Sequence, residues 1–255
     1  MNLFEFFHEA AYRYLGRRVL TADEQREMTK RIRILNRGFG GSDPIDYSDP
    51  LTRLAYTFSY APRHAIIWRE YHRKRTSTAK GDFSLNFLGT ACGPEIVGTL
   101  EGIEWNPRGR LTCFTEDTEP GWQPILDAVI AEYCARRGPV VSCDNSGLAG
   151  QVYTLGSLVL SEIVKQGNYR SFRTSMMERI GPTDGLFLDI TKCRMADGNE
   201  PFLSNVFGFG FYNFRKEGLV LRDIINGELE AINPCYCKLP LMSEPSMNFY
   251  FVKFR

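Results

Sequence analysis

The stretch from Phe83 to Gly98, FSLNFLGTACGPEIVG, constrains the fold of this chain more than any other part of its sequence. An apolar run typical of a strand, Phe83–Leu88, leads into a turn of small residues, and a helix-like segment follows that turn. Small residues let the backbone approach a ligand closely, and the free N–H groups of a new helix face that ligand. The stretch therefore predicts a strand, a ligand-binding turn and a helix.

The segments that follow alternate between strand and helix patterns. Strands are expected at Phe83–Leu88, Arg110–Thr115, Pro139–Cys143, Gln151–Leu160 and Leu186–Ile190. Helices are expected at Glu95–Glu104, from Trp122 to a stop at Gly138, and at Tyr169–Ile180. Crossovers of this kind require parallel strands with helices on both faces. We therefore predict an α/β fold, a Rossmann-like mostly parallel sheet with a helical N-terminal lobe. Two late extended segments, Val206–Phe214 and Phe249–Phe254, would pair at one edge of the sheet.

The first 80 residues have the pattern of a helical lobe. Apolar residues recur at helical spacing from Leu3 to Leu15, and Thr21 with Glu24 has the spacing of a capping box for a helix that ends near Leu35. After a loop at 38–50, a third helical stretch, Leu51–Arg75, is interrupted at Pro62. We place a lobe at residues 1–80 and a Rossmann-like cofactor-binding domain at residues 81–255.

Charge is unevenly distributed along the chain, although the formal net charge is only +1. Residues 1–80 hold 15 Lys and Arg against 9 Asp and Glu, and residues 81–255 hold 16 against 21. Mutual attraction of two lobes explains this asymmetry, and a basic grip on phosphate or on an acidic partner is the alternative. We expect a solvated cationic face formed by five residues of the third helical stretch: Arg63, Arg69, Arg73, Lys74 and Arg75.

Cysteine usage and the N-terminus predict a cytoplasmic protein. The seven cysteines are an odd number, scattered through apolar runs, which fits free thiols better than a disulfide framework. The opening MNLFEFFHEA lacks the features of a signal peptide, and no run approaches the length of a membrane span.

Cys235 and Cys237 with Cys193 lack a second ligand pair at suitable spacing, so we expect no metal site. The histidines His8, His64 and His72 are expected to pack or to lie at the surface, and no catalytic residue is assigned.

In an open parallel sheet, the ligand lies beyond the carboxyl ends of the strands. Three segments are predicted there, and each suits part of an adenosyl ligand. The turn would hold the ligand against the backbone, acids after the second strand would accept from ribose hydroxyls, and polar residues after the third would accept from an adenine amine. The candidate cofactor-binding residues are Gly89, Thr90, Ala91, Gly93 and Glu95 in the turn, Glu116 and Asp117 after the second strand, and Asp144 and Asn145 after the third.

This layout resembles the class I, Rossmann-like S-adenosylmethionine-dependent methyltransferases. FLGTACGPE is similar to their glycine-rich first motif, and Glu116-Asp117 stands where they carry the ribose-binding acid. VYTLGSLVLSEI resembles their fourth strand and following helix, and MNFYFVKFR resembles their last, antiparallel strand. The resemblance implies S-adenosylmethionine as the cofactor and methyl transfer as the activity. It also implies that the helical lobe, including Tyr60 and Arg63, closes over the cofactor.

Two positions depart from that family pattern, and one of them, Glu95, favours a cationic ligand. Gly89 stands where such families often carry an acid, and Glu95 replaces the usual third glycine. A carboxylate at position 95 would repel the pyrophosphate of a dinucleotide but could pair with the amino group of S-adenosylmethionine. The alternatives are a plain strand-to-helix turn, a non-catalytic relative that binds a partner, and a nucleic-acid modifier that uses the same cofactor.

The methyl acceptor is not identified by the sequence. Asn233-Pro-Cys-Tyr236 resembles the signature of amino-methylating enzymes, but it follows the fifth strand rather than the fourth, so we interpret it as a coincidence. The aromatic run Phe207–Phe214 is expected at a buried sheet edge, with an acceptor pocket as the alternative. The near-neutral net charge favours a small molecule or a protein over a nucleic acid.

Overall fold

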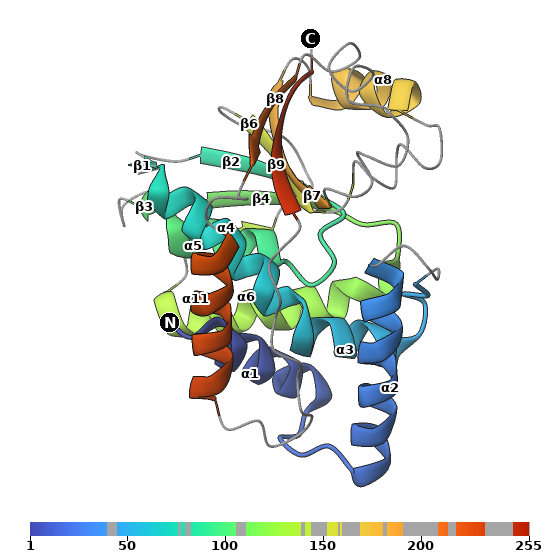
Figure 1. Ribbon diagram of the computed structural model, residues 1–255. Coiled ribbons are helices and arrows are strands. Elements are labelled where there is room, and N and C mark those ends of the chain that lie inside the picture. Colours follow the sequence, from blue (N-terminus) through green and yellow to red (C-terminus); the bar gives the residue numbers. More distant parts are fainter. Residues whose placement is uncertain are drawn as a thin grey trace.

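A seven-stranded sheet organises the second half of the chain (Figure 1). The computed structural model describes residues 1–39, 45–75, 78–79, 83–105, 111–138, 141–143, 152–157, 159, 169–180, 183–190, 209–213, 218–232 and 247–254. The strands lie in the order β5 (Val141–Cys143), β4 (Leu111–Glu116), β2 (Phe83–Leu88), β6 (Val152–Ser157), β7 (Thr183–Ile190), β9 (Met247–Phe254) and β8 (Phe209–Asn213). The first five are parallel, and β9 runs antiparallel to both of its neighbours. The mostly parallel Rossmann-like sheet and the edge pairing of the last two strands are confirmed.

The direction of strand addition reverses at β2. From β2 the chain adds β4 and then β5 on one side, and it returns to add β6 and β7 on the other. Leu88, the last residue of β2, is in register with Glu116 of β4 and with Gly156 of β6. The carboxyl ends of the three strands therefore meet at one edge of the sheet, where open α/β folds bind ligands.

Helices cover the sheet on both faces. On one side lie α5 (Pro94–Gly102) and α6 (Gln123–Arg137), together with the N-terminal helices, and α8 (Tyr169–Ile180) lies on the other (Figure 1). The N-terminal helices are α1 (Leu3–Leu15), α2 (Ala22–Phe39), α3 (Pro50–Ser59) and α4 (Ala61–Lys74). Two further short strands, β1 (Thr78–Ala79) and β3 (Glu104–Trp105), pair with each other. Among the described helices, none is long and apolar enough to cross a membrane.

Local sequence explains most of these helix ends. The expected capping box is present, since the Thr21 amide donates to Glu24 Oε2 (2.8 Å) and the Glu24 amide donates to Thr21 Oγ1 (3.3 Å). Helix α2 continues to Phe39, beyond the expected end at Leu35. The helix α11 (Gly218–Ala231) was not predicted, although its buried residues recur at a spacing of four: Leu221, Ile225 and Leu229.

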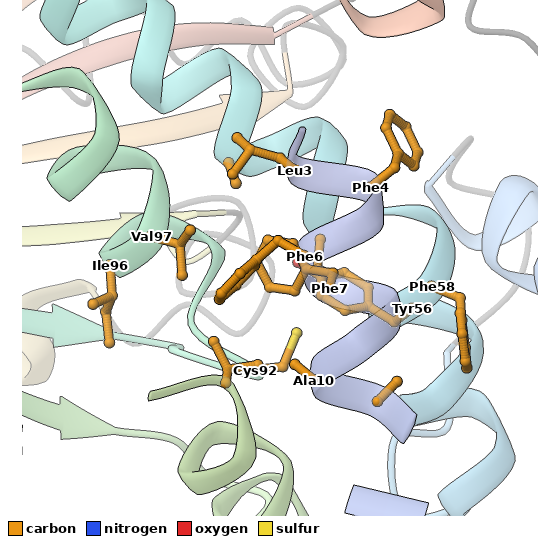
Figure 2. Close-up of a cluster of buried hydrophobic side chains, with 14 of the residues drawn as sticks. Leu3, Phe4, Phe6, Phe7, Ala10, Tyr56, Phe58, Cys92, Ile96 and Val97 are labelled. Carbon is orange, nitrogen blue, oxygen red and sulfur yellow. The ribbon is translucent and has the colours of Figure 1, made fainter. Parts of the chain in front are cut away.

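One hydrophobic core joins the N-terminal helices to the sheet domain. Figure 2 shows aromatic residues of α1 and α3 beside Cys92 of the turn and Val97 of α5. Phe6 of α1 also packs against Tyr133 of α6, with ring centroids 6.1 Å apart. Helices α1 and α4 are therefore packed directly on α6 and α5, which cover the sheet, and the division at residue 80 stays a prediction.

The expected solvated cationic face on α4 is only partly present. Arg73, Lys74 and Arg75 are exposed, but Arg63 and Arg69 are buried. Arg69 forms ion pairs with its neighbour Glu70 (2.7 Å) and with Glu228 of α11 (2.6 Å), while the guanidinium of Arg63 lies over the Tyr60 ring. Burial of a guanidinium requires such partners. Glu228 lies on a helix distant in sequence, so the helical period of α4 does not reveal that Arg69 is buried.

Helices α4 and α5 approach to backbone contact. A Cβ atom at Gly98 would lie 2.4 Å from the Ala65 carbonyl oxygen and 2.6 Å from Trp68 Cβ. At Gly102 it would lie 2.5 Å from the Arg69 carbonyl oxygen. Only glycine fits at either position, so these two residues set the distance between the helices.

We expect Gly98→Ala to destabilise the protein by about 1–3 kcal/mol, because the added methyl group would collide with main-chain atoms of α4 that cannot move aside. The matched control is Gly227→Ala on α11, where a Cβ meets nothing within 4 Å. That change should stabilise the protein by roughly 0.5–1 kcal/mol through helix propensity. Urea unfolding measures both changes, and equal stability of the two variants would contradict the close contact.

Candidate functional site

The turn between β2 and α5 has an unusual backbone. Gly89, Ala91 and Gly93 all have positive φ angles, of 58°, 45° and 79°. An alanine in this region is uncommon and is held there by its surroundings. The Gly93 amide donates to the Thr90 carbonyl (2.7 Å), and Gly93 then caps α5 without a side-chain hydrogen bond. The turn thus presents backbone at the edge of the sheet, as its small residues predict.

On the β4 side of the turn, Asp117 connects two loops. Its Oδ2 accepts a hydrogen bond from the Ala91 amide (2.8 Å), and its Oδ1 accepts from the Glu119 amide (2.9 Å). Burial raises the pKa of Asp117, and these two hydrogen bonds oppose the rise. The Thr118 amide also donates to this carboxylate, which has about four acceptor sites, so Asp117 can still accept from a ligand hydroxyl.

A small pocket lies beside Asp117, with a volume of about 50 Å³. It is lined by residues of the turn, of β4 and of the loop into α6, namely Thr90, Ala91, Thr115, Asp117, Glu119, Pro120, Trp122, Gln123 and Leu126. Trp122 belongs to the short helix η1 (Pro120–Trp122), and its ring lies 5.5 Å from that of Tyr56 on α3. One wall of the pocket is therefore aromatic and is supported by the N-terminal helices.

Arg53 of α3 fixes the same wall from behind. Its Nη1 donates to the Tyr47 carbonyl (2.6 Å) and lies 3.6 Å from Glu119 Oε1. A Cβ atom at Gly121 would lie 2.4 Å from Arg53 Cζ, so the guanidinium packs directly on the loop. The position of the pocket wall thus depends on a residue of the N-terminal helices.

On the β6 side of the turn, Glu95 is buried with one oxygen unsatisfied. The side chain is 1% exposed, and among the described residues its Oε2 has no hydrogen-bond partner. Ser157, the last residue of β6, donates its hydroxyl to this carboxyl group and accepts from Trp68 Nε1 of α4 (3.0 Å). Burial raises the pKa of Glu95 to about 8, and repulsion from Asp117 adds to the rise.

A buried tyrosine–histidine pair completes this side of the site. Tyr56 Oη lies 2.9 Å from His64 Nδ1, and both groups are buried. Burial lowers the pKa of His64 to about 3, so its ring is neutral at physiological pH. Burial and the nearby Glu95 raise the pKa of Tyr56 well above its usual value. Both members of the pair are therefore uncharged when Glu95 titrates.

The structure places the candidate residues as follows. Turn residues Gly89–Glu95 and Asp117 lie together at the carboxyl ends of β2 and β4. Glu116 ends β4, but its side chain lies outside the described part of the structure, as do residues 144 and 145 entirely. Also outside are Cys193, Cys235, Cys237 and the Asn233–Tyr236 stretch. Elsewhere, no three His, Cys, Asp or Glu of the described residues are grouped to hold a metal ion.

Sequence reasoning missed the residues that support the site from other elements. Trp68 and Ser157 are 89 positions apart, and Tyr56 and Trp122 are 66 positions apart. The one available signal was the position of Ser157 in the second half of the predicted strand Gln151–Leu160, since the carboxyl end of a parallel strand faces the ligand edge of the sheet.

Comparison with known proteins finds likeness at the level of structure. No protein-family model matches the sequence, and no curated protein matches it. Similar solved structures include the plantazolicin methyltransferase BamL in complex with a triazolic desmethylPZN analog and SAH (11% identity, 91% of this chain and 98% of that chain covered, TM-score 0.45). The precorrin-6y C5,15-methyltransferase from Geobacter metallireducens GS-15 is 11% identical (72% and 86% covered, TM-score 0.38). The mitomycin 7-O-methyltransferase MmcR is 13% identical (90% and 67% covered, TM-score 0.40). The fold assigned to the chain follows from the order and direction of its own strands.

The buried titratable groups predict a stability maximum near pH 6.5. Burial lowers the pKa of His8 and His72 to about 4, and that of His64 to about 3, so stability is lost as pH falls below 6.5. The raised pKa of Glu95 has the opposite sign, because its stabilising contribution is complete at low pH and is lost as pH rises through about 8.

Urea unfolding between pH 6.5 and 8 should therefore give a free energy of unfolding that falls by up to about 1.4 kcal/mol per pH unit. Glu95→Gln should flatten this alkaline decline while keeping the acid decline, which depends on the histidines. An unchanged alkaline slope in Glu95→Gln would show that Glu95 is not the group responsible.

Proposed function

We propose that the protein transfers a methyl group from S-adenosylmethionine to an acceptor that is a small molecule or a protein. The observation that carries this proposal is the turn between β2 and α5, where small residues let a ligand approach the backbone and acids lie on both sides. This turn follows the strand at which the direction of strand addition reverses. Glu95 and Asp117 lie on the two sides of that turn, and the former keeps a buried oxygen without a partner. An unsatisfied buried carboxyl oxygen is costly, and a cationic ligand would satisfy it.

The charge of the turn favours this cofactor over a dinucleotide. A pyrophosphate at the start of α5 would be repelled by Asp117 and would find no positive charge in Glu95 to offset its own, and unbalanced negative charge in a buried site is costly. S-adenosylmethionine has no phosphate and carries a positive sulfonium and an ammonium group. The residues present therefore fit the cationic adenosyl compound better than NAD.

The candidate residues divide the binding work between the two sides of the turn. On the β4 side, Glu116 and Asp117 would accept hydrogen bonds from the ribose hydroxyls, and Asp144 with Asn145 would hold the adenine. Trp122 offers an aromatic surface in the same pocket. On the β6 side, Glu95 would pair with a cationic group of the cofactor, and Gly89–Gly93 would lie against it.

Catalysis in this proposal is mainly positional. When bound, S-adenosylmethionine supplies a methyl group that is already activated by the positive sulfur. The protein needs to hold the acceptor in line with that group and to exclude water. Helices α3 and α4, with the stacked Tyr56 and Tyr60 rings 6.2 Å apart, would cover the site and select the acceptor.

A non-catalytic binding protein is the second candidate, and the size of the pocket favours it. The pocket that the described residues enclose holds about 50 Å³, whereas sites for small ligands span roughly 300–1,000 Å³. A relative that keeps the fold but no longer admits the cofactor would have such a pocket. Calorimetry with S-adenosylmethionine separates the two candidates, because the second gives no binding heat.

Titration calorimetry should detect S-adenosylmethionine binding by the intact protein, and Asp117→Asn should weaken it about 10- to 100-fold, the loss expected for a hydrogen bond to a charged group. The control is Asp127→Asn on α6, where the carboxylate accepts from Gln123 Nε2 (2.7 Å) at the exposed surface. The control should bind as tightly as the wild type. Equal affinity of both variants would contradict the role given to Asp117.

A further inference from the structure

Glu95 is a buried carboxyl group with no positively charged partner among the described residues. Ser157 donates its hydroxyl to it, the amide of Glu95 itself also donates, and Oε2 keeps no partner among the described residues. Neither of these contacts brings a positive charge. Because a low-dielectric site disfavours an isolated anion, the neutral acid is the stable form of this group.

The groups that face Glu95 do not supply that charge near neutral pH. Asp117, after β4, repels a negative charge on Glu95. Burial raises the pKa values of Tyr56 on α3 and Cys92 in the turn, so both stay neutral. His64 of α4, which contacts Tyr56, is neutral as well, since burial lowers its pKa to about 3.

The cationic side chains of the helix packed on α5 are directed elsewhere. Arg63 lies over the Tyr60 ring, 5.4 Å from its centre. Arg69 forms ion pairs with Glu70 and Glu228, and His72 lies 3.3 Å from Thr99, toward the far end of α5. A proton is therefore the simplest means of neutralising Glu95 in the free protein.

Resting on the proposed function, we propose that Glu95 holds a proton in the free protein and releases it to solvent when a cationic group of the cofactor reaches its unpartnered oxygen. The carboxyl O–H bond breaks, the proton passes to the buffer, and the carboxylate that remains pairs with the ligand cation. The buried site is neutral before binding and neutral after it. An anionic ligand would leave the proton in place, so this exchange selects for positive charge.

Proton release makes affinity depend on pH. Because the pKa of Glu95 in the free protein is about 8, the association constant should fall about tenfold for each unit by which the pH is lowered below that value. The α-amino group of the cofactor has a pKa of about 8, so it is protonated in measurements at about pH 6.5. Any proton released there comes from the protein.

The test is titration calorimetry of the full chain with S-adenosylmethionine at about pH 6.5, in buffers of different ionisation enthalpy. The slope of the observed enthalpy against that ionisation enthalpy counts the protons released. We expect nearly one proton for the wild type and none for Glu95→Gln. The matched control is Glu101→Gln at the other end of α5, where the carboxylate pairs with Arg137 (2.8 Å), and it should also release one proton.

Each outcome separates this inference from the proposed function. Binding without proton release by the wild type, or equal release by Glu95→Gln, overturns the inference and leaves the cofactor assignment standing. Failure of the wild type to bind S-adenosylmethionine overturns both. Should Glu95→Gln not fold, the wild-type dissociation constants at about pH 5.5 and 6.5 decide. A dissociation constant about tenfold larger at about pH 5.5 supports the exchange, and an equal or smaller one overturns it.

Discussion

The close contact between α4 and α5 is the constraint on which the rest of the site depends. Gly98 allows α5 to touch the backbone of α4 at Ala65 and Trp68. That contact places the Trp68 indole where it donates to Ser157, at the end of β6. Ser157 in turn holds Glu95 at the start of α5. A helix of the N-terminal segment thus determines how a carboxyl group is presented at the edge of a sheet formed from the other half of the chain.

The two sides of the turn are chemically different. The β4 side is a small, partly polar pocket in which Asp117 is bonded to backbone amides and Trp122 forms a wall. The β6 side is a closed environment in which the buried Glu95 accepts from Ser157 and lies near the repelling Asp117. A ligand that spans the turn would meet, on one side, carboxylate oxygens that accept hydrogen bonds from hydroxyls and, on the other, a carboxyl group that favours a cation. S-adenosylmethionine carries both ribose hydroxyls and positively charged groups.

Much of the fold could be predicted from the sequence because it is encoded locally. Phe83–Leu88 and Tyr169–Ile180 have the predicted bounds, and the small residues of 89–93 adopt the left-handed backbone that such a turn requires. Helix α11 was not predicted, although its buried residues Leu221, Ile225 and Leu229 recur at helical spacing on one face.

The contacts that shape the site could not be predicted in this way. The burial of Arg69 depends on Glu228, and the position of Glu95 depends on Trp68 and Ser157. These partners are distant in sequence, and periodicity describes only neighbours along the chain. The acids themselves were found from their positions after predicted strands, whereas the raised pKa of Glu95 follows from burial, which only the packed structure reveals.

The most direct test of the central claim is a crystal structure of the protein grown with S-adenosylmethionine. The adenosine should lie against Gly89–Gly93 beside Asp117, with a cationic group of the ligand within hydrogen-bond distance of Glu95 Oε2. A ligand bound away from this turn, or one bound here with Glu95 still lacking a positively charged partner, would contradict the claim.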